Sequence, residues 1–360
     1  MSEDTAVATP ITDSTKHMTD HILGPVGAPL LVLPMRFVIT WMFFSAAWRR
    51  LVLDGGKMDP TSAAWIGQKI NNFYPHALLI KPLLGWLISD INRLDVFMWL
   101  FTFIEFAVGV GVAFGLFSRL AAFGSVLLSF FMLLGAGWLG ATCLDEWQIG
   151  CWGIAGGFVV MIAGGGKLSL DSLIGRRFPR WTRGGLAWIT SGRVLERRGA
   201  TVFVSAATVI TVFLMLWTNQ AFVGGLWGPL ANPSAKPSIK VSEVTGSGTS
   251  LKLTVFRDGG PDTYGAFVTQ LTVLDSSCNA ITTVSDSDLA KIAKAGEIAN
   301  AYPAHVAAGP DGFTVPLGAL GTMTLDMGTS VDQVAVVQLR DVSGTWWASS
   351  KTCATPKAGS

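Results

Sequence analysis

Charged side chains are scarce in this sequence. Only 14% of the 360 residues are Asp, Glu, Lys or Arg, while 50% are apolar, and soluble domains average about 25% charged residues. The net charge of +2, with no basic stripe carrying interleaved aromatics, argues against nucleic-acid binding. The composition therefore indicates a membrane protein, and the length leaves room for a helical bundle and one extramembrane domain.

Motifs for metal and nucleotide cofactors are also missing. The chain has no Cys-x-x-Cys-His for haem, no cysteine spacing for an iron–sulfur cluster, and no Gly-x-Gly-x-x-Gly at a strand-to-helix turn. Its four histidines are scattered and predict no metal site, and Gly164–Gly166 is expected to end a helix rather than cradle a phosphate. A two-electron reaction would therefore use a diffusible quinone, a cysteine pair, or a cofactor without a sequence motif.

A cleavable signal pattern is missing from the first residues. Residues 1–28 are polar and irregular, without the charged and then apolar order of a secretory signal. They are expected to form a disordered cytoplasmic N-terminus.

Five apolar runs dominate the next part of the chain. A spanning helix needs about 20 mostly apolar residues, because lipid offers no partner for an unpaired backbone group. Four of the runs predict a four-helix membrane domain over residues 29–175, and the last predicts a fifth spanning helix over 200–220. The runs are Leu30–Leu53, Phe97–Phe117, Leu120–Leu139, the short and glycine-rich Ile149–Ala163, and Ala200–Trp217.

The segment 54–94 is too mixed to cross a membrane. Ile66, Ile70 and Phe73 have the spacing of one helix face. This pattern predicts short amphipathic helices on the membrane surface, carrying a surface histidine at His76. Prolines are expected to break these helices at Pro60, Pro75 and Pro82.

Basic residues set the expected orientation. The loop 176–199 is rich in arginine, and cytoplasmic loops carry an excess of Lys and Arg. Five spans then put the N-terminus inside and both the segment 54–94 and the tail outside. All four cysteines fall on the outer side, where disulfides persist: they are Cys143, Cys151, Cys278 and Cys353.

The tail, residues 230–360, has a different pattern. Alternating apolar residues, such as Leu251, Leu253 and Val255, predict strands of an extracytoplasmic β-sandwich, with one helix near Asp288–Ala299. A structural disulfide between Cys278 and Cys353 would close a loop of roughly 75 residues and contribute roughly 4 kcal/mol.

Several short motifs resemble the DoxX/DoxD membrane family. They are Glu105–Gly109, Gly115–Ala122 and Gly164–Asp171, together with Arg36 in the first helix. The last third, from Gly225–Leu230 onward, resembles DoxA. The chain is thus similar to a fusion of the two subunits of thiosulfate:quinone oxidoreductase.

This resemblance implies an oxidoreductase of the inner (cytoplasmic) membrane. It would oxidise thiosulfate to tetrathionate on the outer side and pass the electrons to membrane quinone, a co-substrate. Terminal oxidase subunits or a second copy of the chain are the expected protein partners, besides the lipid bilayer. Two alternatives remain: a non-catalytic membrane subunit whose β-domain binds a partner, and a DoxX-like quinone reductase that uses another reductant.

Glu105 is the most unusual polar residue in the spans. A charge at the middle of a spanning helix costs about 2.5–3.5 kcal/mol on insertion scales. A structural interpretation pairs Glu105 with Arg36 across two helices. A functional interpretation places Glu105 on a proton path or in a quinone pocket, because quinone reduction consumes two protons.

The predicted outer side carries an unusual group of cations, Arg49, Arg50 and Lys57. They either extend toward lipid headgroups or attract a small dianion such as thiosulfate. The second interpretation makes them the substrate-binding residues.

Cys143 and Cys151 lie at the expected outer ends of two neighbouring helices. They form a structural bridge, remain thiols, or act as a redox disulfide that thiosulfate attacks before the dithiol reduces quinone. The acidic Asp145 and Glu146 would repel the dianion and count against the redox role. Residues predicted for the quinone pocket are Trp147, Trp152 and Arg36.

Overall fold

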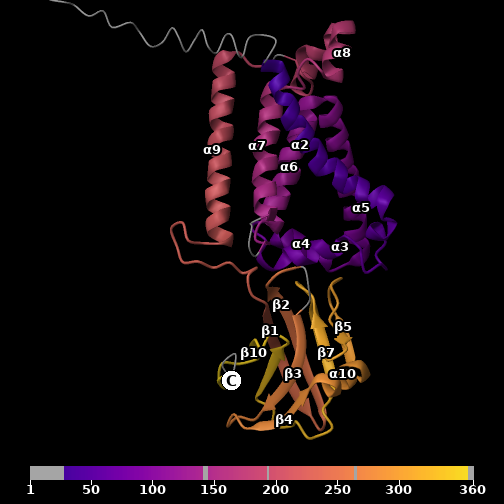
Figure 1. The fold of residues 1–360 in the computed structure, drawn as a ribbon, viewed down its shortest axis with the longest axis vertical. Coiled ribbons are helices and arrows are strands. Elements are labelled where there is room, and N and C mark those ends of the chain that lie inside the picture. Colours follow the sequence, from indigo (N-terminus) through magenta and orange to yellow (C-terminus); the bar gives the residue numbers. More distant parts are fainter. Residues whose placement is uncertain (1–27, 141–144, 193, 263–265, 356–360) are drawn as a thin grey trace, which may run out of the picture. The chain divides into compact units, whose positions relative to one another are not determined.

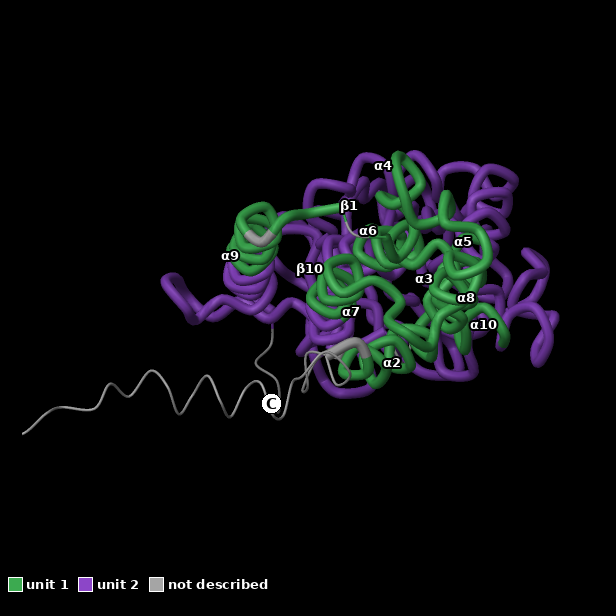
Figure 2. Tube along the Cα trace, turned by 90° about the horizontal axis from the view of Figure 1, so that it is seen from above, with its two compact units in different colours: residues 1–48, 104–127, 153–210 green, residues 49–103, 128–152, 211–360 purple. Residues whose placement is uncertain are grey.

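The structure is a computed structural model that describes residues 28–140, 145–192, 194–262 and 266–355. The chain divides into two compact units (Figure 2), and each is described by itself. The first unit comprises residues 1–48, 104–127 and 153–210, and the second comprises 49–103, 128–152 and 211–360. The segment expected to be disordered lies, except for Ala28, outside the described residues.

Within the described residues, five helices are long and apolar enough to cross a membrane, which confirms the predicted bundle with its fifth helix. They are α2 (Ala28–Trp48), continued by the π-helical η1 (Arg49–Leu53), α5 (Ile91–Phe114), α6 (Ser118–Ala136), α7 (Asp145–Ala163) and α9 (Arg197–Phe222) (Figure 1). Helices α7 and α9 are longer than the predicted apolar runs, because their end turns contain polar residues that such a run does not include. Glu146 suits the first turn of α7, since acidic residues stabilise a helix N-terminus.

The first unit packs its helices closely. An added Cβ on Gly109 of α5 would lie 2.8 Å from the backbone nitrogen of Phe44 on α2, so only glycine allows this approach. Helix α7 ends at Ala163, and Gly164 has a φ of +68°, which confirms the predicted helix end. The elements that follow α7 are α8 (Leu170–Arg177), η4 (Pro179–Thr182) and η5 (Gly184–Trp188).

The second unit begins with the predicted amphipathic segment. It forms η2 (Gly55–Met58), α3 (Gly67–Phe73), η3 (Tyr74–His76) and α4 (Lys81–Ile88). Pro75 and Pro82 lie in the first turns of η3 and α4, so the prediction that they break helices is wrong. A first-turn residue needs no hydrogen-bonded N–H, and the fixed φ of proline favours helix initiation.

The tail forms two antiparallel sheets, as predicted. Strand order is β1-β2-β8-β5 in one sheet and β10-β9-β3-β7-β6 in the other, where β4 also pairs with β3. The apolar residues that alternate along β2, including Leu251, Leu253 and Val255, all point into the domain core. The strands are β1 (Ser238–Ser247), β2 (Ser250–Gly259), β3 (Ala266–Leu274), β4 (Ala280–Ser285), β5 (Glu297–Asn300), β6 (Ala307–Gly309), β7 (Gly312–Val315), β8 (Leu320–Asp326), β9 (Val336–Asp341) and β10 (Trp346–Ala348).

The helix predicted near Asp288–Ala299 is shorter than expected. Helix α10 runs over Asp286–Ala295 and ends before Gly296. The last residues of the predicted helix belong instead to strand β5, which pairs with β8. Glycine is the least favourable helix residue besides proline, so the chain leaves the helix there.

A buried asparagine joins α3 to the β-domain within the second unit. Asn71 is fully buried, its Nδ2 donates to the Gly318 carbonyl at 2.6 Å, and its Oδ1 accepts from the Ala304 amide at 3.3 Å. Gly318 has a φ of +76°, and an added Cβ there would lie 2.2 Å from the Asn71 carbonyl oxygen. We call this contact the Asn71 latch.

Candidate functional site

Asp171 is the polar centre of the first unit. Its carboxylate is fully buried and accepts bonds from the amides of Phe117 and Ser118 at 3.0 and 2.9 Å. Three side chains also donate to it: the hydroxyls of Ser118 and Ser191 and the indole N–H of Trp181. Because Ser118 begins α6, the carboxylate satisfies free amides at a helix N-terminus, where negative charge is favoured.

Arg36 satisfies the C-terminal end of helix α5. Its Nε donates to the Val112 carbonyl at 3.0 Å and its Nη2 to the Ala113 carbonyl at 2.7 Å, both in the last turn of α5. Nη1 donates to the carbonyls of Gly165 and Leu168. A buried cation is thus satisfied by main-chain oxygens that have no partner inside the helix.

Arg119 has the same role at the end of α7. Its Nε donates to the Met161 carbonyl at 2.9 Å. Its Nη1 donates to the carbonyls of Ala187 and Thr190 at 2.7 and 2.8 Å and also contacts the Gly192 carbonyl. The guanidinium therefore ties the loop after η5 to α7.

These three residues carry much of the resemblance noted in the sequence, and here each of them satisfies helix ends. Their charges are matched to the partial charges of those ends. In this chain, the motif residues therefore satisfy helix ends in the bundle.

An apolar pocket lies between α6, α7, α9 and η5 in the first unit. Its volume is about 390 Å³, and the side chains around it include Phe123, Met161, Trp188 and Phe203. Arg119 also lines it. The pocket thus combines apolar walls with the cation of Arg119, a combination that suits a membrane-soluble ligand with a polar head.

A basic recess lies beside the apolar pocket in the same unit. It measures about 660 Å³ and is lined by Lys167, Arg176 and Arg183, together with the hydroxyl residues Ser172, Thr182 and Ser191. From the sequence, the basic loop predicted only the orientation of the protein. The recess was not predicted, because its lining residues come from four separate stretches of the chain.

The predicted outer cations lie in the second unit and differ in environment. Arg50 Nη1 donates to the hydroxyl of the fully buried Thr102 at 3.1 Å, and its guanidinium lies 5.9 Å from the Phe101 ring centroid. Arg49 is exposed and Lys57 is half-buried. Arg50 is therefore engaged within the protein, and a substrate role for the three residues stays a prediction.

Glu105 lies on α5 in the first unit and is 5% exposed. Arg36 gives its hydrogen bonds to main-chain carbonyls and not to Glu105, so the predicted pairing of these two residues is wrong. The physical reason is that the end of α5 presents unpaired carbonyls to Arg36. A proton-path or quinone role for Glu105 stays a prediction.

The predicted cysteine pair is only half described. Cys151, on α7, is a free thiol that is 7% exposed, whereas Cys143 lies outside the described residues. Trp147 donates its indole N–H to Thr218 of α9 at 2.8 Å, and Trp152 is 50% exposed. Arg36 lies in the first unit, whereas Trp147 and Trp152 lie in the second, and a quinone pocket formed by these residues stays a prediction.

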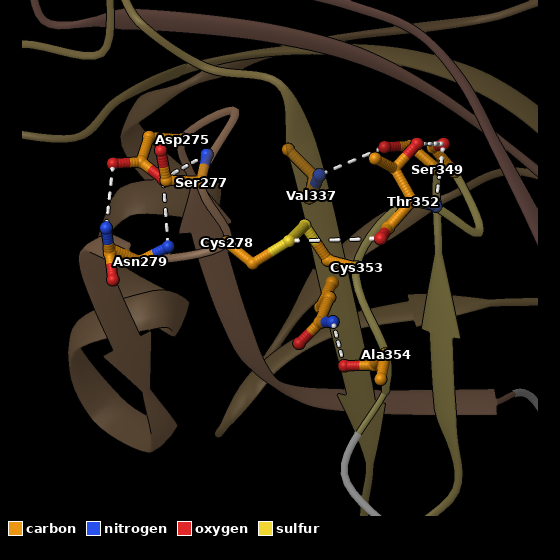
Figure 3. Close-up of a disulfide and its surroundings, with 11 residues drawn as sticks. Asp275, Ser277, Cys278, Asn279, Val337, Ser349, Thr352, Cys353 and Ala354 are labelled. Carbon is orange, nitrogen blue, oxygen red and sulfur yellow. Dashed lines mark hydrogen bonds between the residues drawn. A yellow bond between two sulfur atoms is a disulfide. The ribbon is translucent and has the colours of Figure 1, made fainter.

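The β-domain carries the predicted disulfide. Cys278 and Cys353 are bonded, with their Cα atoms 5.5 Å apart (Figure 3). Beside it, Asp275 accepts bonds from the amides of Ser277 and Asn279 and so orders the turn that holds Cys278. The bridge fastens the end of the domain to the β3–β4 turn.

His76 is not the surface histidine that the sequence predicted. It is half-buried, its Nε2 lies 2.7 Å from the Asp258 carbonyl oxygen, and its ring centroid lies 4.8 Å from that of Trp138. Burial lowers the pKa of His76 against the opposing effect of Asp258. Its role is therefore to help join η3 to the β-domain.

Among the described residues, no group of three or more histidine, cysteine, aspartate or glutamate side chains could hold a metal ion.

Two family models match this chain. Residues 31–198 match the model described as TQO small subunit DoxD, and residues 222–350 match the model described as TQO small subunit DoxA. No solved structure matches the chain. The two matches follow one another in the predicted order and leave α9 between them. The chain therefore belongs to the DoxD and DoxA families of thiosulfate:quinone oxidoreductase small subunits, joined in one polypeptide.

Proposed function

We propose that this chain is a membrane-bound thiosulfate:quinone oxidoreductase. Two thiosulfate dianions each give up one electron and join through a new S–S bond to form tetrathionate. One quinone takes up the two electrons and two protons and becomes quinol. The observation that carries the proposal is the succession of DoxD and DoxA matches over residues 31–198 and 222–350.

The proposed location is the inner membrane, with the N-terminus in the cytoplasm and the β-domain outside. The excess of arginine over residues 176–199 supports this orientation. One proposal is that thiosulfate is oxidised on the outer side, at Arg49, Arg50 and Lys57. A second proposal is that thiosulfate binds in the basic recess of the first unit.

Two chemical routes lead to tetrathionate. In the cysteine route, thiosulfate attacks a Cys143–Cys151 disulfide, a second thiosulfate releases tetrathionate, and the dithiol reduces quinone. Thiol–disulfide exchange needs an accessible sulfur, and Cys151 is only 7% exposed. This burial favours the direct route, in which bound thiosulfate and quinone react without a covalent intermediate.

The test uses the purified full chain in proteoliposomes with a short-chain quinone. The expected result is quinol formation that depends on thiosulfate, with two thiosulfates consumed and one tetrathionate formed per quinol. Substitution of both Cys143 and Cys151 by serine leaves turnover near normal if the direct route operates, and abolishes it if the cysteine route does. A well-folded wild-type chain that reduces no quinone would instead favour a membrane anchor for a partner.

A further inference from the structure

We propose that the basic recess binds the thiosulfate oxyanion and that the adjoining apolar pocket binds the quinone head, so that both substrates meet in the first unit. This inference rests on the proposed function and assigns its two binding sites. It also moves thiosulfate from the predicted outer cations to the arginine-rich segment of the first unit.

The charges of the recess fit an oxyanion. Lys167, Arg176 and Arg183 are exposed and form no ion pair within the described part of the chain. No acidic side chain is among the described residues that line the recess. Three cations without counter-ions around one hollow create a positive potential that attracts a dianion.

Hydrogen-bond donors add to these charges. The hydroxyls of Ser172 and Thr182 line the recess and have no partner in the described residues. The third hydroxyl, that of Ser191, is already held by Asp171 and the Gly165 amide. The recess thus has a fixed floor and free donors at its rim, as a site for a small acceptor-rich anion requires.

The size and the charge change suit the reaction. The recess has a volume of about 660 Å³ and so has room for small anions. Two dianions carry twice the negative charge of the tetrathionate that they form. Oxidation therefore weakens the attraction of the product for the recess and favours its release.

The two hollows share their walls. On α7, Met161 and Ile162 face the apolar pocket and Ala163 faces the recess. After η5, Ile189 lines the pocket, while Ser191 and Gly192 line the recess. Consecutive residues thus separate an apolar ligand from a charged one, and the Arg119 bonds to the carbonyls of Met161 and Gly192 hold this partition.

Arg119 gives the apolar pocket a polar group that suits a quinone carbonyl. Arg119 directs Nε and Nη1 to main-chain oxygens, while its Nη2 has no partner among the described residues. A donor within apolar walls matches a quinone head, whose carbonyl oxygens accept hydrogen bonds and whose ring is apolar.

The same oxyanion chemistry occurs in phospholipid headgroups. Leu173 and Phe178, near the recess, are each 61% exposed, which suits a membrane surface. The experiment must therefore separate a soluble oxyanion from an anionic lipid.

The recess test neutralises Lys167, Arg176 and Arg183 together to glutamine in the full chain. A matched control neutralises Arg177, Arg180 and Arg198, which are equally exposed and do not line the recess. Both proteins are placed in nanodiscs of phosphatidylcholine alone, and thiosulfate binding is measured by calorimetry and turnover by quinol formation. We expect the recess variant to weaken thiosulfate binding and raise its KM about tenfold or more, at unchanged quinone KM, and the control to change both less than about twofold.

The pocket test replaces Ala200, which lines the apolar pocket, by phenylalanine. Ala206 on the same helix does not line the pocket and is exposed, so Ala206→Phe is the control. The expected result is a higher quinone KM for Ala200→Phe alone, with thiosulfate binding unchanged. Equal quinone KM values in the two variants would overturn the assignment of this pocket.

Three outcomes distinguish the possibilities for the recess. Unchanged thiosulfate binding in the recess variant, together with loss of co-purified phosphatidylglycerol, would overturn the proposal in favour of a lipid site. Oxidation of external thiosulfate by sealed right-side-out vesicles, but not by inside-out ones, would also overturn it and favour Arg49, Arg50 and Lys57. The third outcome is a wild type that binds thiosulfate but reduces no quinone, together with a recess variant that no longer binds thiosulfate. This result would support the recess as the thiosulfate site and reject the proposed function.

Discussion

Two buried polar sites, one in each unit, are satisfied in different ways. In the first unit, full charges meet helix ends: Asp171 satisfies the start of α6, while Arg36 and Arg119 satisfy the ends of α5 and α7. In the second unit, a neutral amide, that of Asn71, joins α3 to the β-domain. The difference follows from the groups to be satisfied, since helix ends carry partial charges and an isolated carbonyl–amide pair does not.

This contrast has a consequence for substitution. A charge-assisted hydrogen bond is about twice as strong as a neutral one, so the stability contributed by Asp171 should exceed that contributed by Asn71. Replacing Asp171 by asparagine, or Asn71 by aspartate, should therefore destabilise the folded protein, for opposite reasons. Asp171 would lose a charge that the helix end favours, and Asn71 would gain a charge with no counter-ion.

The largest effect is expected for Asp171→Asn. The new amide keeps the shape but brings N–H donors toward the donors of Ser118 and Trp181, and removes a buried charge that they share. We expect a loss of about 3–5 kcal/mol, seen as a lower Tm in detergent and a smaller monodisperse fraction. Glu196→Gln is the control, because Glu196 is exposed in the same unit. Equal stability of the two variants would contradict the hydrogen-bonding role of Asp171.

A smaller effect is expected for Asn71→Leu. The change leaves the Gly318 carbonyl and the Ala304 amide without partners, at a cost of about 1–3 kcal/mol. Hydrogen exchange should increase at Ala304 and around Gly318, while exchange in the first unit stays unchanged. Asn72→Leu is the matched control, because its side chain makes no hydrogen bond within the described residues. Asn71→Asp should lower the stability more than Asn71→Leu. The reverse order would contradict the comparison between the buried charge of Asp171 and the neutral amide of Asn71.

The smallest effect is a pH dependence of the contact between His76 and the Asp258 carbonyl. Burial lowers the pKa of His76 below its ordinary value of about 6.5, so the unfolded state binds the proton more readily than the folded state. Its contribution is therefore fully present above about pH 6.5 and is lost as the pH falls through the lower folded pKa. His76→Gln should reduce the drop in Tm between pH 8 and pH 5. An identical drop in both proteins would assign the pH dependence to other groups.

The sequence was sufficient for the parts of the fold that depend on apolar pattern. Spanning helices need long apolar runs, and the alternating Leu251, Leu253 and Val255 of strand β2 are buried in the domain core. Helix ends were less predictable, because polar first turns such as that of α7 do not belong to an apolar run. The prolines were misjudged since the same residue breaks a helix inside it and starts one at its first turn.

The candidate site was much less predictable. Arg36 looked like an ionic partner for Glu105 because both are charges in apolar runs, but its acceptors are backbone carbonyls, which every residue has and no motif marks. The basic recess gathers Lys167, Arg176 and Arg183 through the folding of α8 and η4. The arginine content was visible, whereas the hollow is a property of the tertiary structure.

Helix α9 has one more consequence. It covers residues 197–222, the interval between the DoxD and DoxA matches, and only 11% of its span is buried. It also tethers the β-domain: Thr218 and Phe222 are buried near its end, and strand β1 begins at Ser238. A short tether holds two modules at an effective concentration in the millimolar range. The Asn71 latch therefore needs only millimolar intrinsic affinity to remain closed, and a chain cut after α9 should show whether the contact survives dilution.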